Sequence, residues 1–540
     1  CFAIPGDEQW PSPSEWAELN KTVGGRLIAA RPLAAVCHTG DPFNVYDESK
    51  CAEVKAGWDR PETHFVDPVE FNTPIFQNAS CDPFTPAERV CDLGNYVSYA
   101  INLTMKTAVR DVQAGLEFAR RKGVRVVVKN TGHDYLGKST GKGALSFWTH
   151  NLRERTVIED YKSKDYQGPA IKLGAGMLTG EAYETAREAG YRVVGGSCPT
   201  VGIAGGYAQG GGHSSLASLY GLAADNVLEW EVVTPEGEHV VATPTGRYKD
   251  LYWALSGGGG GTFGVVISMT ARLHPDGIVG GASFSFTAPM DKFWDAVESF
   301  HRLGIRYIDA GNSMIYMLRM LETNTPILIA FSVTVPGKNE TGVKEAMQPF
   351  LDDLKGRDIA YNFESHVSQT FLDHFARDFG PLPYGMFPVS QITGSRLLPR
   401  SAIQDTESSK AVTEALKLAV ESEGFYLGCN LFNAGVVRPK NAVNPAFRES
   451  VSHCIVVGPW DFTLPRGFML ERQRRLTEVI QPALDEATRG SGTYLNEGNS
   501  EQGDWREQFY GEDVYKRLKK VKERYDPGRL FYARTAVGSE

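Results

Sequence analysis

The chain has 540 residues, of which 42% are hydrophobic and 22% are charged, and its formal net charge is −9. This composition is typical of a soluble globular protein, and the length predicts two lobes or domains. No Lys/Arg-rich run could follow a phosphate backbone, and no apolar run approaches the roughly 18 residues that cross a bilayer, so we expect neither a nucleic-acid nor a membrane partner.

Cysteines concentrate at the start of the chain, where five of the eight lie within the first 91 residues. Their surroundings are rich in Pro, Asn and Asp and show little helical periodicity, so cross-links would order them. We therefore expect a secreted protein with a disulfide-containing extension over residues 1–90. Proximity in sequence suggests three pairs and leaves two cysteines over, although spacing does not fix connectivity. The pairs are Cys37 with Cys51, Cys81 with Cys91 and Cys429 with Cys454, which leaves Cys1 and Cys198.

Four N-x-S/T sequons agree with secretion, although so short a pattern also arises by chance. They begin at Asn20, Asn78, Asn102 and Asn339, where N-glycans are expected. The alternative is a cytosolic protein with free buried thiols.

Residues 105–124 place apolar side chains on one helical face and lead into an apolar strand at 123–128. A strand at 171–174, a helix at 181–188 and a hairpin around 235–237 follow. Mixed helices and strands are therefore predicted for a domain over residues 91–275.

Glycine becomes rarer after residue 275, and amphipathic stretches alternate with short apolar runs such as 327–335. The stretches cover 289–303, 341–356, 408–422 and 469–488. They predict a second domain over 276–485, in which helices cover one side of a mainly antiparallel sheet. Residues 486–540 are again glycine-rich and are expected to return to the first lobe, so the predicted fold class is α+β.

Candidate binding residues gather in two glycine-rich segments. The first, Val126–Gly143, is a buried strand that opens into a loop, where Gly132 and Gly137 allow the backbone to approach a pyrophosphate closely. We expect neither the GxGxxG fingerprint nor the GxxxxGK[ST] pattern in this segment, so nucleotide sites that begin a helix are not predicted here. The second, Gly195–Asn226, holds eight glycines between Gly195 and Gly212. Such a density costs chain entropy, and it indicates backbone that lies against a ligand.

Long motifs around these segments resemble the vanillyl-alcohol-oxidase flavoprotein superfamily, and in particular its berberine-bridge-enzyme branch. They are NTGHDYLGKSTG, GGSCPTVGIAGG, YGLAADNV, YWALSGGGGGTFGVV and the terminal RYDPGRLF. Together with WPS and TVGGRLI they are most similar to fungal isoamyl-alcohol-oxidase-like proteins. The resemblance implies a two-subdomain PCMH-type FAD-binding domain, a substrate domain and a berberine-bridge-like C-terminal segment.

The resemblance also implies that FAD is bound covalently at two points. His133 matches the histidine that bonds the 8-methyl carbon of the flavin, and Cys198 matches the cysteine that bonds carbon 6. Two tethers hold the ring rigidly and favour hydride uptake. The alternatives are a loop histidine hydrogen-bonded to backbone and a disulfide-bonded Cys198.

Further FAD contacts are implied by matching positions, which otherwise serve as turn or strand residues. They are Asn130, Thr131, Gly132, Asp134, Gly137, Lys138, Ser139, Gly202, Gly205, Gly206, Gly264, Val266 and Asn496. Lys129 replaces a common arginine, which keeps a cation but loses the bidentate fork. Val201 matches the gate position, where a small residue resembles oxidases that admit O2. No metal ion is expected.

Alcohol oxidation needs a base near the flavin. His213 follows Gly212 and has a suitable unperturbed pKa, although it could instead cap backbone groups. In YLNEGN, Tyr494 and Asn496 match a family strand that faces the flavin, whereas Glu497 replaces its second tyrosine. Glu497 is thus a candidate acid or base, or else an exposed loop residue.

The sequence therefore predicts a secreted, monomeric FAD oxidase that converts an alcohol or carbohydrate hydroxyl while reducing O2 to H2O2. The rivals are a flavin dehydrogenase with another acceptor and a flavin- or carbohydrate-binding protein without turnover.

Overall fold

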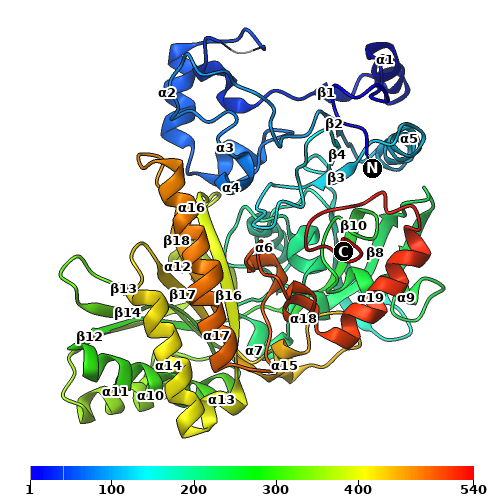
Figure 1. Ribbon diagram of the computed structural model, residues 1–540. Coiled ribbons are helices and arrows are strands. Elements are labelled where there is room, and N and C mark those ends of the chain that lie inside the picture. The colour runs from blue at the N-terminus through cyan, green and yellow to red at the C-terminus, as the bar shows by residue number, and fades with distance from the viewer. Residues whose placement is uncertain (1, 41) are drawn as a thin grey trace.

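The computed structural model describes residues 2–40 and 42–540, which fold into two lobes built around separate sheets (Figure 1). Cys1, one of the two cysteines expected to stay unpaired, lies outside the described residues. Within these residues no helix is both long and apolar enough to span a bilayer.

The first lobe begins with a four-stranded sheet of order β1-β2-β4-β3. Its strands are β1 (Leu27–Ala29), β2 (Tyr99–Asn102), β3 (Val126–Lys129) and β4 (Leu145–Trp148). Helix α5 (Ala108–Lys122) packs on this sheet because Val112, Leu116 and Ala119 recur on one face and are fully buried. This confirms the predicted helix and the strand that follows it.

A five-stranded antiparallel sheet of order β5-β6-β10-β8-β9 completes the first lobe. Its strands are β5 (Arg155–Lys162), β6 (Gln167–Gly174), β8 (Val227–Val233), β9 (His239–Ala242) and β10 (Val265–Arg272). Helices α6 (Thr179–Glu188), α7 (Ala217–Tyr220), α8 (Ala223–Asn226) and α9 (Lys249–Leu255) accompany it, and β7 (Tyr191–Arg192) pairs with β11 (His274–Pro275). The β8–β9 pair confirms the predicted hairpin.

The second lobe is a seven-stranded antiparallel sheet of order β15-β12-β14-β13-β17-β18-β16. Its strands are β12 (Val279–Thr287), β13 (Ser313–Met320), β14 (Pro326–Pro336), β15 (Tyr361–Ser368), β16 (Gln391–Pro399), β17 (Tyr426–Leu431) and β18 (Ser450–Pro459). Its helices are α10 (Met290–Asp309), α11 (Glu340–Gly356), α12 (Phe371–Phe379), α13 (Arg400–Gln404), α14 (Thr406–Glu421), α15 (Ala446–Glu449), α16 (Arg466–Arg475) and α17 (Gln481–Ala487).

One face of this sheet is covered by the long helices α10, α11, α14, α16 and α17 (Figure 1). These match the four predicted amphipathic stretches, and the whole molecule has the predicted α+β fold.

Residues 2–40 and 42–540 contain three disulfides, two of them in the N-terminal region, and all three join the cysteines paired by proximity. The bonds are Cys37–Cys51, Cys81–Cys91 and Cys429–Cys454. The region is more helical than its sequence suggested, with α1 (Pro13–Thr22), α2 (Glu48–Gly57), α3 (Pro61–Phe65) and α4 (Pro74–Gln77). The apolar residues of α2 do not gather on one face, so periodicity could not reveal it, and the Cys37–Cys51 bond anchors it instead.

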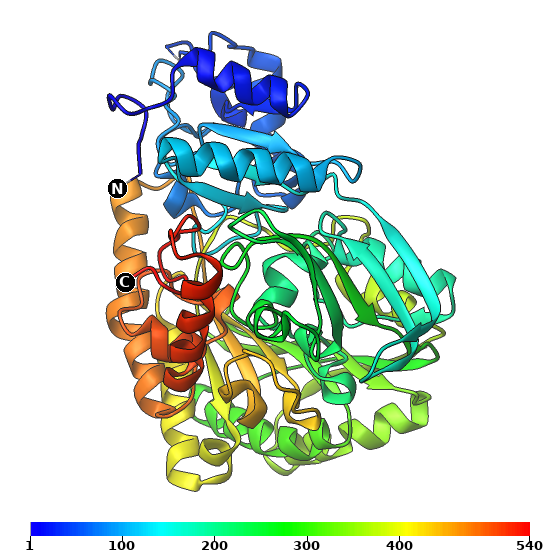
Figure 2. The same cartoon turned by 90° about the vertical axis from the view of Figure 1, so that its right-hand side faces the viewer.

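The C-terminal helix α19 (Glu512–Tyr525) lies against α9 in the first lobe, and α18 (Trp505–Tyr510) contacts α19 (Figure 1). The C-terminal segment lies beside the first lobe in the turned view as well (Figure 2). Beyond them, Phe531 forms a bridge to Val126 at the start of β3. The buried Lys522 ammonium fixes this arrangement by pairing with Asp526 at 2.6 Å and donating to the carbonyl of Thr262 at 2.7 Å. The end of the chain thus supports the strand that carries the first glycine-rich loop.

Candidate active site

A cavity of about 620 Å³ lies between the glycine-rich segments and the seven-stranded sheet. The sheet lines it with alternate residues, such as Ile315 and Met317 on β13, because side chains along a strand point to opposite faces. The intervening Met314, Tyr316 and Leu318 belong to the core beneath the helices. One face of the sheet therefore builds the second core while the other forms a cavity wall.

The cavity brings together nearly all of the predicted site residues. From the two glycine-rich segments come Asn130, Thr131, Gly132, His133, Asp134, Lys138, Ser139, Cys198, Val201, Gly202, Gly205, Gly206 and His213, and from elsewhere come Gly264, Val266, Tyr494, Asn496 and Glu497. Gly137 is the exception, because its Cα faces the ring of Phe76, where a Cβ would come within 2.8 Å.

The side of the cavity lined by the two glycine-rich segments is called the cofactor wall here. Two observations show that the cofactor wall fits an anionic, flat cofactor. The Lys138 ammonium is buried and has no hydrogen-bond partner among the described residues, and burial lowers its pKa to about 8, so an anion would stabilise its charge. The backbone also approaches itself closely, since a Cβ on Gly260 would lie 3.0 Å from the Cα of Gly206. A pyrophosphate beside Lys138 would account for the first feature, and glycine backbone that lies along the cofactor would account for the second.

Local contacts fix the conformation of the first glycine-rich loop. Gly132 has φ +90°, and a Cβ there would lie 2.9 Å from the carbonyl oxygen of Glu70. Asp134 accepts hydrogen bonds from the backbone and the hydroxyl of Ser139, both at 2.7 Å. The amide groups of the loop are thereby positioned without a helix.

Residues 132–139 do fit the pattern GxxxxGK[ST] of phosphate-binding P-loops, so the expectation that this segment lacks the pattern was wrong. A P-loop requires a helix directly after the lysine, whereas this segment continues as irregular chain to β4. The structure therefore does not support a P-loop. Nor does Lys129 take the place of the family's arginine, because its ammonium leaves the cavity and donates to the carbonyl of Asp67 at 2.5 Å.

His133 and Cys198 face one another across the cofactor wall. The Sγ of Cys198 lies 4.0 Å from Nε2 of His133, and the hydroxyl of Thr200 lies within hydrogen-bonding distance of both. Burial lowers the pKa of His133 to about 4, which keeps its imidazole neutral, and burial raises the pKa of the Cys198 thiol. Cys198 forms no disulfide within the described chain, so that alternative is excluded there.

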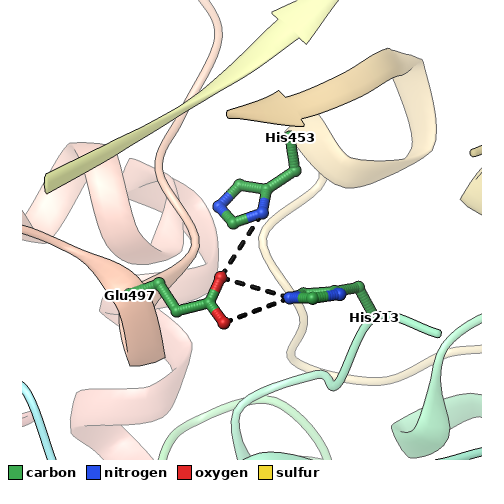
Figure 3. Close-up of side chains that lie close together, drawn as sticks. All are labelled: His213, His453 and Glu497. Carbon is green, nitrogen blue, oxygen red and sulfur yellow. Dashed lines mark hydrogen bonds and ion pairs between the residues drawn. The ribbon is translucent and has the colours of Figure 1, made fainter. Parts of the chain in front are cut away.

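An acid–base cluster lies where the cofactor wall meets the sheet (Figure 3). Nε2 of His213 is 3.2 and 3.1 Å from the two carboxylate oxygens of Glu497, and Nδ1 of His453 is 3.4 Å from one of them. Burial raises the pKa of Glu497, but the two histidines outweigh it and hold that pKa below its usual range. Glu497 is therefore a half-buried, ionised carboxylate, not an exposed loop residue.

Tyr494 and Asn496 support this cluster. The Tyr494 hydroxyl accepts hydrogen bonds from the backbone of Gly212 at 3.2 Å and from Nδ2 of Asn496 at 2.6 Å. Burial raises the pKa of Tyr494 well above its usual value, so the phenol stays protonated. Its contacts fix the turn that carries His213.

The sequence reasoning missed His453, which is fully buried on β18 beside Glu497. Burial lowers the pKa of His453 to about 3. The alternation of Ser450, Ser452 and Cys454 with Val451 and His453 indicated a strand, but only the paired sheet shows which face His453 occupies.

Comparisons with known proteins agree with this geometry. A profile described as a FAD binding domain matches residues 105–243, and one described as berberine and berberine like matches residues 493–538. VAO-type flavoprotein oxidase VAO615 of Thermothelomyces thermophilus is 49% identical over 546 residues, covering 100% of this chain and 93% of that protein. Bifunctional decalin synthase calF of Penicillium decumbens is 46% identical, with coverage of 100% and 93%.

Solved structures show the same relationship. The crystal structure of the VAO-type flavoprotein MtVAO615 from Myceliophthora thermophila C1 has a TM-score of 0.95 at 48% identity, with 100% of this chain and 97% of that chain covered. Berberine bridge enzyme from Eschscholzia californica shares the fold, with a TM-score of 0.68 at 16% identity and coverage of 97% and 99%.

Proposed function

Because the chain belongs to the VAO-type flavoprotein oxidases, we propose that it oxidises a hydroxyl group of an apolar small molecule in the cavity and passes the electrons to O2. The observation that carries this proposal is one cavity in which a cofactor wall, an acid–base cluster and an apolar sheet face meet. When bound, FAD accepts a hydride from the substrate carbon and is reoxidised by O2, which yields H2O2.

His133 and Cys198 are the proposed points of covalent attachment. Both line the cavity, and their contacts are hydrogen bonds that attachment could displace: His133 with Asn72 at 3.1 Å and with Thr200 at 2.9 Å, and Cys198 with Thr200 at 3.3 Å. A neutral imidazole is the nucleophilic form of histidine. The nearness of the two reactive atoms, 4.0 Å apart, supports attachment at neighbouring positions of one ring system.

The His213–Glu497 pair is the proposed base. Both side chains line the cavity, and the carboxylate orients the imidazole and stabilises the positive charge that appears when the pair takes up the hydroxyl proton. Nδ1 of His453 lies 3.4 Å from a carboxylate oxygen of Glu497, and His453 does not line the cavity. Tyr494, being protonated, acts as a positioning residue instead of a base.

The substrate wall favours an apolar alcohol over a carbohydrate. It is lined by Ile315, Met317, Ile329, Phe331, Met386, Phe387, Ile455 and Val457. Among its polar side chains, Gln391 already donates to the hydroxyl of Tyr135 at 2.5 Å. Tyr426 and Asn430 could serve one or two hydroxyls, but the remaining hydroxyls of a sugar would face apolar side chains, at a cost of about 1–3 kcal/mol each.

O2 is the proposed acceptor, because Val201, the residue matching the gate position, lines the cavity and is small. We propose secretion of a monomer as well, supported by the two disulfides of the N-terminal region. Asn78 and Asn339 are exposed and suit glycans, whereas Asn20 and Asn102 are half-buried.

Anaerobic mixing of the yellow protein with a panel of aliphatic alcohols, aromatic alcohols and oligosaccharides tests the proposal. Apolar alcohols are expected to bleach the flavin band faster than sugars of equal concentration, and admission of air should release one H2O2 per turnover. Bleaching by sugars alone would refute the substrate class. Bleaching with reoxidation by dyes but not by air would identify a dehydrogenase, and binding without bleaching a protein that lacks turnover.

A further inference from the structure

A second cluster of metal-ligating side chains lies outside the cavity, at the edge of the seven-stranded sheet. His366 comes from the edge strand β15, and His374 and Asp378 come from α12, which packs on β15 and β12. The two residues on α12 are four apart and therefore share one face of the helix.

The ligand atoms of the three side chains converge. Nε2 of His374 is 3.3 Å from one carboxylate oxygen of Asp378, and Nε2 of His366 is 3.9 Å from the other. One atom from each residue fits within a 4.8 Å span. Ligands around a tetrahedral Zn²⁺ at about 2.1 Å are about 3.4 Å apart, so small shifts bring these atoms to coordination distances.

Two of these atoms have no hydrogen-bond partner within the described residues, although the hydroxyl of Ser332 acts on the Asp378 carboxylate. Nε2 of His366 and Oδ2 of Asp378 are buried without a hydrogen-bond partner, and the Asp378 side chain is only 3% exposed. An unpaired buried carboxylate oxygen costs free energy unless a ligand compensates it. The nearest partner, Nε2 of His374, already contacts the hydroxyl of Thr334 at 3.0 Å.

The backbone makes room for the two imidazoles. Gly281 on β12 pairs directly with His366 on β15. A Cβ at Gly281 would lie 2.4 Å from Nε2 of His366 and 2.9 Å from Cε1 of His374. Any other residue at this position would push the rings out of the cluster.

We propose that His366, His374 and Asp378 bind one divalent transition-metal ion, of which Zn²⁺ is the representative, with Thr334 or water completing the coordination. Two imidazoles and one carboxylate suit Zn²⁺, whereas Ca²⁺ and Mg²⁺ require more oxygen ligands. This departs from the sequence-based expectation that no metal is bound.

The ion would fix α12, and through it part of the cavity wall. The rings of Phe371 and Phe375 on α12 pack edge-on against Tyr183 of α6 in the first lobe. At the end of α12, the ring centroid of Phe379 lies 6.3 Å from that of Phe387, which lines the cavity. The site therefore has a structural role that connects the sheet edge to the substrate wall.

The test uses flavin-loaded protein dialysed against EDTA and then titrated with ZnCl2 by calorimetry, with bound zinc counted by mass spectrometry. The variants are Asp378→Asn and His366→Gln, and Glu497→Gln is the matched control, because Glu497 belongs to the other His/carboxylate cluster. His366→Gln guards against misfolding, since its ring nitrogen Nε2 makes no hydrogen bond.

We expect one zinc per chain in the wild type and in Glu497→Gln, and at least a 100-fold weaker affinity in both cluster variants. Zinc should also raise the Tm of the wild type by a few degrees and leave that of His366→Gln unchanged. Absence of binding to the wild type would overturn the proposal. So would binding that is lost in Glu497→Gln but kept in Asp378→Asn.

Discussion

Replacing Glu497 with Gln should slow flavin reduction by two to four orders of magnitude, with little change in substrate affinity. The substitution keeps the side-chain volume but removes the charge that lies 3.1 Å from Nε2 of His213. At an effective dielectric constant of about 20, such a pair interacts by about 5 kcal/mol. General-base catalysis contributes roughly 10²–10⁴-fold, or about 2.7–5.5 kcal/mol, so both estimates give the same range.

The assay is stopped-flow reduction of the flavin under argon with an alcohol that bleaches the wild type. The matched control is Glu231→Gln, because Glu231 makes the same kind of contact, 3.0 Å from Nε2 of His239, but lies outside the cavity. This control should reduce at the wild-type rate. Reduction of the Glu497→Gln variant at an unchanged rate would refute the assignment of the base.

The reduction rate should fall in acid, because the two histidines hold the pKa of Glu497 below its usual range, so the carboxylate is ionised at neutral pH and gains a proton only as the pH falls through that lowered pKa; a pH series in stopped flow checks this, and a flat profile would contradict it. Lys138→Met should weaken FAD binding about 10- to 150-fold, the equivalent of one charge-assisted hydrogen bond, when measured by fluorescence titration in a variant without the two tethers. Joint replacement of Cys429 and Cys454 with Ala should cost about 3.5 kcal/mol of unfolding free energy, because their bond closes a loop of 25 residues; urea unfolding followed by tryptophan fluorescence measures the loss, and unchanged stability would contradict it.

Periodic segments were predictable from the sequence because their local pattern agrees with their packing. The apolar face of α5 and the strand β3 after it appear within 25 residues of sequence, and the long helices over the second sheet do as well. The glycine-rich segments likewise indicated a ligand, because only close backbone approach explains their glycine density.

Features that depend on contacts between distant segments were not predictable. His453 meets Glu497 only because β18 lies beside the C-terminal segment, and Lys129 turns toward Asp67 because an N-terminal loop offers carbonyl groups there. The helix α1 is a different case. Its capping box of Ser12 and Glu15 was visible in the sequence as an S-x-x-E pattern followed by apolar residues, and it was overlooked.

Acid precipitation of the purified protein, followed by mass spectrometry of its tryptic peptides, tests the proposed flavin attachment most directly. We predict that the yellow colour stays with the polypeptide and that one FAD joins the peptide of His133 to that of Cys198. If the flavin of fully loaded protein passes entirely into the supernatant, the covalent attachment proposed for this cavity is wrong.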